Sequence, residues 1–175
     1  MNHGDSMKQI QDFFNEIKNI EYGWHDKDGN IHESLKGARE GMILQESETI
    51  VEDNHAVCWE MCELQREFFK REKIDYKNIF VYLNNPNRYA YHTFSIFQHQ
   101  NRWFWFEASW LTKKGIHEFV SIKEIFDYFR NNFEDFARGE YNPEEVEFIE
   151  YDDVKAGMNT TEFVTQCLKG KKVEE

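Results

Sequence analysis

The sequence predicts an α+β domain in which a cysteine-bearing helix packs on an antiparallel β-sheet with flanking helices. Segments with helical periodicity are segregated from a run of β-like segments. The β-like segments follow one another through short turns, which favours antiparallel pairing. Aromatic residues make up 17% of the 175 residues, enough to build a sizeable core. Because no repeat or low-complexity tract interrupts the chain, we expect residues 1–175 to form one domain.

The first third of the chain predicts two helices separated by a hairpin and an irregular segment. Ser6 is expected to cap a helix that runs to about Lys18. The dipeptide Asp28-Gly29 lies between two short β-like runs and predicts a tight turn. Residues 35–46 are expected to be irregular, and Ser47 is expected to cap a short helix.

A longer helix is predicted in the middle of the chain. Asp53 or Asn54 is expected to cap it, and it is expected to end near Glu72. Apolar residues at helical spacing form its core stripe: Val57, Met61, Leu64 and Phe68. Two cysteines, Cys58 and Cys62, lie beside this stripe, and Cys58 falls in the first turn or so of the helix.

The remaining chain predicts four β-runs and two further helices. The β-runs are residues 78–83, 88–97, 102–107 and 146–151. The helices are residues 122–133 and a last one that Thr160 caps and Gly170 ends.

Two of these β-runs place a histidine near a carboxylate. A turn around His99-Gln100 makes the numbers of facing residues add up to about 199, so His92 is expected directly opposite Glu107. Directly opposed side chains have Cβ atoms roughly 4.5–5.5 Å apart, close enough for an imidazole and a carboxylate to hydrogen-bond. Strand alternation puts His92 on the same face as Phe94, the face expected to meet the helices.

Such a pair can activate a thiol, because a carboxylate that fixes the histidine tautomer makes the other ring nitrogen a general base. Cys58 is the candidate, since the positive end of a helix dipole and a nearby imidazolium both favour a thiolate. Its backbone N–H is a natural oxyanion donor. Cys62 lies one turn deeper among Phe and Met residues and is expected to be inert, as is Cys167.

Zinc binding is the less favoured alternative for these residues. His55, Cys58 and Cys62 would share a face of the expected helix and could bind zinc with His92. The spacing H-x-x-C-x-x-x-C is not one that zinc fingers use. We therefore expect neither a metal nor a cofactor.

Several short motifs occur in a fixed order: V-C-W-E at 57–60, Y-H-T-F at 91–94 and W-F-W-F-E-A-S-W at 103–110. Together they resemble the transglutaminase-like branch of the papain-fold thiol enzymes. More narrowly, the chain is similar to small bacterial transglutaminase-like proteins of undefined substrate, through Tyr22-Gly23-Trp24 and the G-I-H-E-F segment at 115–119. The resemblance covers nearly the whole chain.

The resemblance implies a thiol-dependent acyl-transfer enzyme, either a cysteine peptidase or amidase or a transglutaminase-like acyltransferase. Cys58 would attack an amide or ester group of a peptide or protein substrate, His92 would take and return the proton, and Glu107 would orient His92. The acyl group would then pass to water or to an amine. Hydrolysis is favoured because no dedicated acceptor site is visible in the sequence.

Two positions depart from the pattern of the family. The third triad position usually carries an aspartate, where this chain has Glu107. The papain-type glutamine six residues before the nucleophile is replaced by Glu52. Both departures favour the alternative, a catalytically silent papain-fold module that binds a peptide or a protein partner.

Further residues are expected to line the substrate site: Tyr22, Trp24, Asn54, Trp59 and Trp110. The first two lie in an early loop that would cover the cleft. Asn54, Gln45 or the Trp59 indole could supply a second oxyanion donor. Trp110 follows an aromatic strand, where a core role is the usual alternative.

Charge and composition limit the classes of partner that the sequence predicts. Lys+Arg 21 minus Asp+Glu 33 gives −12, and no basic stripe offsets it. Neither nucleic acid nor a membrane is therefore expected as a partner. The chain starts without an apolar signal-peptide region, and three cysteines favour a reducing compartment. A cytoplasmic location is the expectation.

Overall fold

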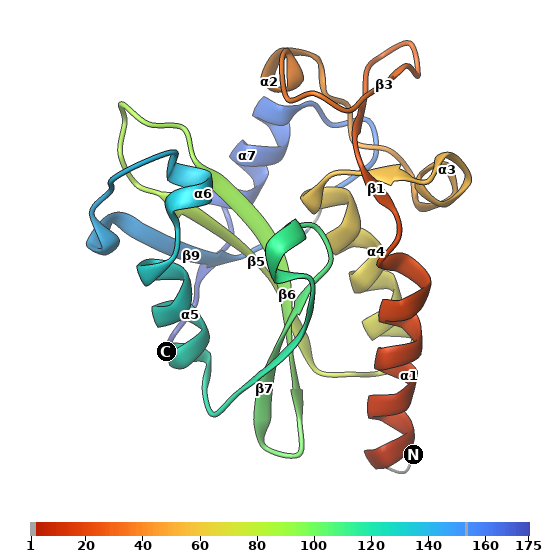
Figure 1. Cartoon of the computed structure of the whole chain (residues 1–175), viewed down its shortest axis with the longest axis vertical. Coiled ribbons are helices and arrows are strands. Elements are labelled where there is room, and N and C mark those ends of the chain that lie inside the picture. The colour runs from red at the N-terminus through yellow and green to blue at the C-terminus, as the bar shows by residue number, and fades with distance from the viewer. Residues whose placement is uncertain (1–2, 153) are drawn as a thin grey trace.

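The computed structural model describes residues 3–152 and 154–175, with a six-stranded β-sheet at the centre (Figure 1). The order of neighbouring strands is β10-β9-β5-β6-β7-β8, and each neighbouring pair is antiparallel. The strands are β5 (Tyr76–Leu83), β6 (Tyr91–His99), β7 (Arg102–Glu107), β8 (Gly115–Phe119), β9 (Val146–Glu150) and β10 (Lys171–Lys172). The predicted α+β class is confirmed.

Helices cover both faces of this sheet (Figure 1). One face carries α1 (His3–Ile17), α4 (Cys58–Arg71) and α7 (Thr160–Leu168). The other carries α5 (Ile122–Asn131) and α6 (Glu134–Ala137). Two short 3-10 turns, η1 (Leu111–Lys113) and η2 (Pro143–Glu145), precede β8 and β9.

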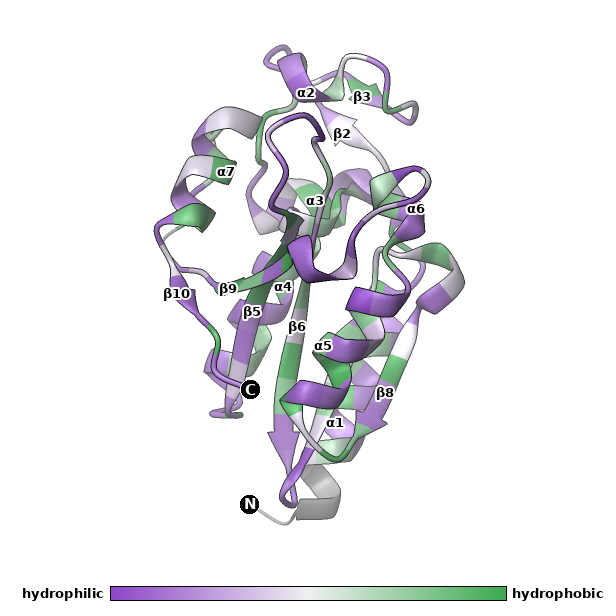
Figure 2. Cartoon of the chain, turned by 90° about the vertical axis from the view of Figure 1, so that its left-hand side faces the viewer, coloured by the Kyte–Doolittle hydropathy of each residue, from purple (hydrophilic) through white to green (hydrophobic). Residues whose placement is uncertain are grey.

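Strand alternation sends apolar side chains to both covered faces. On the α5 side, strand residues Ile79, Val81, Phe94, Ile96 and Trp105 pack against helix residues Phe126 and Phe129. On the α4 side, Phe97, Phe104 and Phe106 pack against Phe14, Phe68 and Phe69. β6 is buried without interruption over residues 92–97, and Figure 2 shows its hydrophobic stretch between the helices. Polar side chains on this strand are therefore enclosed on either face.

A group of small elements lies beside the N-terminal end of α4 (Figure 1). β1 (Glu21–Tyr22) pairs in parallel with β4 (His55–Ala56), and β2 (Trp24–His25) pairs antiparallel with β3 (Ile31–His32). Two short helices follow β3 along the chain: α2 (Ala38–Gly41) and α3 (Ser47–Asp53). The hairpin predicted at Asp28-Gly29 is confirmed, and Gly29 supplies the positive φ of 83° that its turn needs.

The start of α4 differs from the prediction. Asn54 has a left-handed φ of 53° and ends α3, so it does not cap α4. His55–Ala56 then form β4, and Val57 is the N-cap of a helix whose first residue is Cys58. The parallel pairing with β1 holds the chain extended at a point where helical periodicity suggested that α4 had already begun.

Other helix ends also differ by one or a few residues. α1 begins at His3, so Ser6 lies inside it, and the N-caps of α3 and α7 are Glu46 and Asn159 rather than Ser47 and Thr160. The segment 35–46, expected to be irregular, contains α2. β6 starts at Tyr91 rather than residue 88, and α5 ends at Asn131 rather than residue 133. β8, β1 and β4 are too short or too weakly alternating to be predicted.

The described residues contain no helix that is both long and apolar enough to span a lipid bilayer.

Candidate active site

The hairpin of β6 and β7 has a register two residues away from the prediction. His99 pairs with Arg102 across a turn of Gln100 and Asn101, whose φ angles are both positive, and the ladder continues to Ser95 opposite Phe106. Facing residues therefore add up to 201 rather than 199. Extending the ladder by one pair puts Glu107 opposite Phe94, so His92 is its diagonal neighbour rather than its direct partner. A shift of two residues keeps every side chain on its predicted face.

The Glu107 carboxylate is buried and receives four hydrogen bonds. Oε1 accepts from His92 Nε2 at 2.6 Å and from Trp105 Nε1 at 3.3 Å. Oε2 accepts from the backbone N–H groups of Ser109 at 2.9 Å and Trp110 at 3.0 Å. Burial raises the pKa of Glu107, but the charge and hydrogen bonds of His92 and the two backbone donors lower it further, so the net pKa is below the ordinary value. A carboxylate held in this way has a fixed direction.

The His92 ring lies in a nearly closed aromatic pocket. The Phe136 ring stacks on it with centroids 4.6 Å apart, and the Trp110 ring meets it edge-on at 6.1 Å. Since Nε2 donates to Glu107, Nδ1 is the ring nitrogen left to interact with the Cys58 thiol. The tautomer is therefore the one that a general base for Cys58 requires.

Cys58 is the first residue of α4, the helix that packs on the opposite side of the sheet from Phe94 and Phe129. The side chains of Cys58 and His92 meet beyond the end of the pairing between β6 and β7. Phe106 is the last residue of β7 that pairs with β6, and β6 continues past this point to His92. After Glu107 the chain turns away, so no neighbouring strand separates the two faces on that side of His92. The thiol reaches the imidazole at this gap.

The thiol of Cys58 lies beside the His92 ring and Thr93, both of which lower its pKa. Burial raises the pKa of Cys58, but the interaction with His92 and its positive charge, together with Thr93, outweigh burial, and the net pKa lies below the ordinary value. Burial lowers the pKa of His92, but the Glu107 charge and the bonds to Cys58 and Glu107 outweigh it, and the net pKa is raised. Both directions favour a thiolate–imidazolium pair.

The other two cysteines behave differently. Cys62 is 1% exposed, lies one turn deeper in α4, and its pKa is raised well above the ordinary value by burial. Cys167 on α7 is fully buried, and burial also raises its pKa. All three thiols are free. Only Cys58 combines a thiolate-favouring environment with residual exposure, at 9% of its surface.

Two of the predicted substrate-site residues lie next to the triad. Trp110 contacts the His92 ring and is held by a hydrogen bond from its Nε1 to Asp135 Oδ2 at 2.9 Å. Tyr22 packs in the same cluster as Cys58, and its pKa is raised by burial and by the nearby charges of Cys58 and Glu60. The sequence analysis missed Phe136, which stacks on His92 from an unpredicted helix, and Thr93, whose alternation pointed away from His92.

Other predicted residues are placed elsewhere or enclosed. Trp59 is 1% exposed and packs edge-on against Phe163, while Trp24 stacks on His32 and donates its Nε1 hydrogen to the Ser34 carbonyl. Asn54 uses its backbone carbonyl to accept from Glu21.

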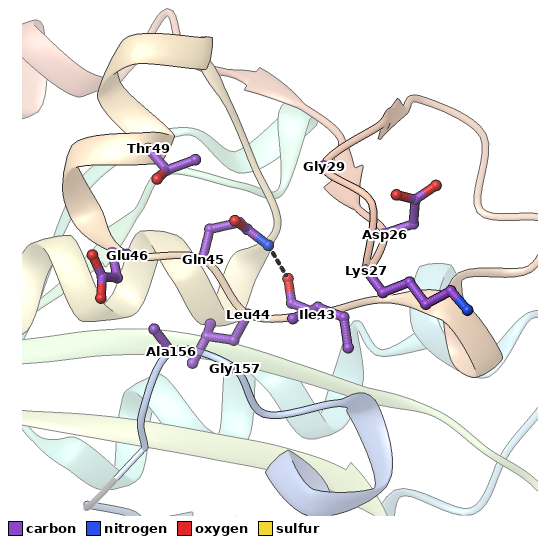
Figure 3. Close-up of a pocket in the computed structure, with 10 residues that line it drawn as sticks. All are labelled: Asp26, Lys27, Gly29, Ile43, Leu44, Gln45, Glu46, Thr49, Ala156 and Gly157. Atoms are coloured by element: carbon purple, nitrogen blue, oxygen red, sulfur yellow. Dashed lines mark hydrogen bonds between the residues drawn. The ribbon is translucent and has the colours of Figure 1, made fainter.

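Gln45 and Glu52 do not complete an oxyanion hole either. Gln45 lines a cavity of about 440 Å³ whose walls do not include Cys58 or His92, and its side-chain amide donates to the Ile43 carbonyl (Figure 3). Glu52 is exposed on α3.

No family model, no curated protein and no solved structure matches the chain. The family resemblance of its motifs therefore stays a prediction. Cys58, His92 and Glu107 form the one arrangement among the described residues that points to chemistry at this site.

Proposed function

We propose that the protein is a thiol-dependent acyl-transfer enzyme of the papain/transglutaminase-like type, with Cys58, His92 and Glu107 as its triad. One observation carries the proposal: a buried imidazole hydrogen-bonds a carboxylate through one ring nitrogen and interacts electrostatically with a thiol, so that each alters the pKa of the other. Three groups from α4, β6 and the end of β7 converge in the order that nucleophilic catalysis uses. The α+β fold, with the cysteine at the start of a helix packed on an antiparallel sheet, is consistent with this assignment.

The chemistry follows from the pair of charges. The Cys58 thiolate attacks the carbonyl carbon of an amide, and the electron pair of the carbonyl moves onto its oxygen. The His92 imidazolium then gives its proton to the departing amine, which leaves a thioester on Cys58. In the second half, His92 takes a proton from the acceptor, the acceptor displaces the thiol, and Cys58 is restored.

The first turn of α4 is placed to stabilise the oxyanion. The first N–H groups of a helix have no partner inside the helix, and the positive end of the dipole lies there. The Cys58 N–H is the first such donor in α4. The Tyr22 hydroxyl, whose ring packs in the same cluster as Cys58, is the strongest candidate for a second donor.

We favour hydrolysis of the thioester over transfer to an amine, with a peptide or a protein as the substrate. Among the residues that the structure describes, none near the triad forms a recognisable site for an acceptor amine. Three free cysteines agree with the reducing cytoplasm that we expect for this protein.

A second candidate function is a catalytically silent papain-fold module that binds a peptide or a protein partner. One observation favours it: the triad is nearly closed to solvent, with Cys58 9% exposed, His92 2% and Glu107 1%. An enzyme in this state needs a movement near Tyr22 or α6 before a substrate can reach the sulfur. A binding module needs no such movement.

Thiol alkylation separates the two functions. The protein is treated with a small excess of iodoacetamide at about pH 6, and the adduct is located by peptide mass mapping. The enzyme is expected to be labelled at Cys58 well before Cys62 or Cys167, because only the pKa of Cys58 lies below the ordinary value, while burial raises the pKa of the other two. The His92→Ala variant is expected to lose this selectivity.

Equal slow labelling of all three cysteines in the wild type would favour the binding module. A panel of amide substrates then tests turnover directly, with Cys167→Ser as the control that removes a thiol outside the triad. Substrate cleavage that survives Cys58→Ser would exclude the proposed nucleophile.

A further inference from the structure

A second group of ionisable side chains lies outside the triad. The Nε2 atom of His55 is 3.1 Å from Glu21 Oε2 and 3.1 Å from Glu33 Oε1. One ligand atom from each of the three residues lies within 4.8 Å of the other two. Glu21 lies in β1, Glu33 directly follows β3, and His55 lies in β4, so the fold brings them together across 34 positions of sequence.

We propose that Glu21, Glu33 and His55 form a binding site for a divalent transition-metal ion such as zinc. Zinc is bound in proteins by imidazole nitrogens and by carboxylate oxygens at about 2.0–2.2 Å. Two ligand atoms at that distance from a tetrahedral ion lie about 3.3 Å apart, close to both observed separations from His55. The side chains need to move little to receive the ion.

The orientation of His55 suits a metal ligand. Its Nδ1 atom lies 2.8 Å from the backbone carbonyl of Asp53 and donates to it, which directs the lone pair of Nε2 toward the two glutamates. Metal-binding histidines usually have such a second hydrogen bond, which fixes both tautomer and ring direction.

Gly23 makes room for this ring. A Cβ atom built on Gly23 would lie 2.8 Å from His55 Cδ2, closer than real Cβ atoms approach. Gly23, the single residue between β1 and β2, therefore lacks a side chain at the point where the imidazole packs. The pairing of Glu21 with His55 in the parallel β1–β4 ladder puts the first carboxylate on the same side.

The net negative charge of the group favours binding of a cation. Two carboxylates share one imidazole, so the group keeps a net negative charge whether or not His55 is protonated. The glutamate side chains are 63% and 72% exposed and His55 is 15% exposed, so an ion has direct access. Water would complete the coordination, because three protein ligands leave a fourth position open.

A bound ion would join three segments that surround the start of α4. Glu21 precedes Tyr22, and His55 precedes the N-cap Val57 and Cys58 along the chain. The site would thus fix the loop that carries Tyr22 relative to the thiol. Its existence does not depend on the proposed chemistry of Cys58.

Calorimetric titration of the full chain with zinc chloride at about pH 7, after treatment with a chelator, tests the site. The wild type is expected to bind one zinc ion per chain. The Glu21→Gln/Glu33→Gln variant removes two ligands at exposed positions and is expected to bind at least about 100-fold more weakly, since losing even an outer hydrogen-bond partner of a metal ligand costs about 10–100-fold.

The matched control is Glu16→Gln/Glu52→Gln, which removes the same charge from exposed positions on α1 and α3. It is expected to bind zinc like the wild type. A Cobalt(II) complex of the wild type is expected to lack the thiolate-to-metal charge-transfer absorption that cysteine ligands give.

Three results would overturn the proposal. The first is a wild type that binds no zinc at micromolar concentration, and the second is equal binding by the Glu21→Gln/Glu33→Gln variant. The third is zinc binding that disappears in Cys58→Ser but persists in the double glutamine variant, which would place the ion on the thiol. Each would leave His55 and its glutamates as an ordinary ion pair.

Discussion

His92 Nε2 lies 2.6 Å from Glu107 Oε1, although the two residues are diagonal rather than opposite across β6 and β7. Diagonal neighbours on one face of a sheet have Cα atoms roughly 7–8 Å apart, farther than direct partners. The additional methylene of glutamate, relative to aspartate, supplies the reach. The glutamate that departs from the expected motif is therefore matched to the register of this hairpin.

The Glu107→Asp variant tests this match. The shorter side chain is expected to lose the hydrogen bond to His92, because the carboxylate stops short of Nε2. Without that partner the pKa of His92 falls and the thiolate of Cys58 loses its counter-charge, so alkylation at pH 6 is expected to slow at least about tenfold. The rate is measured by mass spectrometry over time.

Glu118→Gln is the control for Glu107→Asp, since Glu118 is an exposed carboxylate on β8 that pairs with Arg102 and not with the triad. It is expected to leave the alkylation rate unchanged. A Glu107→Asp variant that reacts as fast as the wild type would show that the carboxylate does not set the thiol's reactivity.

The sequence predicts the His92–Glu107 pair in spite of a wrong register. An error of two residues in the pairing keeps each side chain on its predicted face of the sheet. The long glutamate side chain still reaches His92 from the diagonal position. The turn at Gln100 and Asn101 uses two residues with positive φ, which Asn favours and Gln does not, so the turn position was not evident from composition.

The contact of Cys58 with His92 has no simple signal in the sequence. It depends on where β7 stops pairing with β6, and that point is set by the hydrogen bonds that Glu107 accepts from Ser109 and Trp110. The start of α4 at Cys58 depends in turn on a two-residue parallel pairing with β1. Neither feature has a local sequence signal, because both arise from contacts between distant segments.

The pH dependence of alkylation tests the thiolate–imidazolium pair. A thiol with the ordinary pKa of about 8.5 is only about 0.3% ionised at pH 6. Burial raises the pKa of Cys58, but His92 lowers it by more. As the pH increases, the alkylation rate of the wild type is therefore expected to rise at a lower pH than that of an ordinary thiol. In His92→Ala burial acts without the opposing imidazolium, so the rise in alkylation rate is expected to shift to higher pH. Identical profiles from pH 5 to pH 10 would contradict the pairing.

Tyr22 is expected to limit access to the thiol. Its ring packs in the cluster that contains Cys58, which is 9% exposed. Tyr22→Ala is expected to raise the alkylation rate of Cys58 several-fold by opening that side of the site. Tyr22→Phe keeps the ring and removes only the hydroxyl, so its alkylation rate is expected to stay near the wild-type value. Loss of substrate turnover in Tyr22→Phe would identify the hydroxyl as an oxyanion donor. Equal alkylation rates in Tyr22→Ala and Tyr22→Phe would contradict the covering role of the ring.

Glu60 gives α4 a pH-dependent stability. Its carboxylate is 1% exposed and accepts hydrogen bonds from the backbone N–H groups of Val57 at 3.0 Å and Gln45 at 2.7 Å. Burial raises its pKa to about 7 despite these bonds. Because the folded state holds this proton more tightly than the unfolded state, the contribution is complete below about pH 4.5 and is lost as the pH rises through 7. The loss amounts to about 3 kcal/mol, at 1.36 kcal/mol for each unit of pKa.

Urea unfolding of the wild type and Glu60→Gln at several pH values between 4 and 8 measures this contribution. A glutamine does not titrate, so the difference in unfolding free energy between the two proteins is expected to change by about 3 kcal/mol across this range, with the wild type losing stability relative to the variant as the pH rises. Groups such as His92 titrate in both proteins and cancel in the difference. Glu52→Gln, an exposed carboxylate on α3, is expected to run parallel to the wild type. A Glu60→Gln curve that is also parallel would mean that Glu60 is ionised throughout, held by its two backbone donors against the cost of burial.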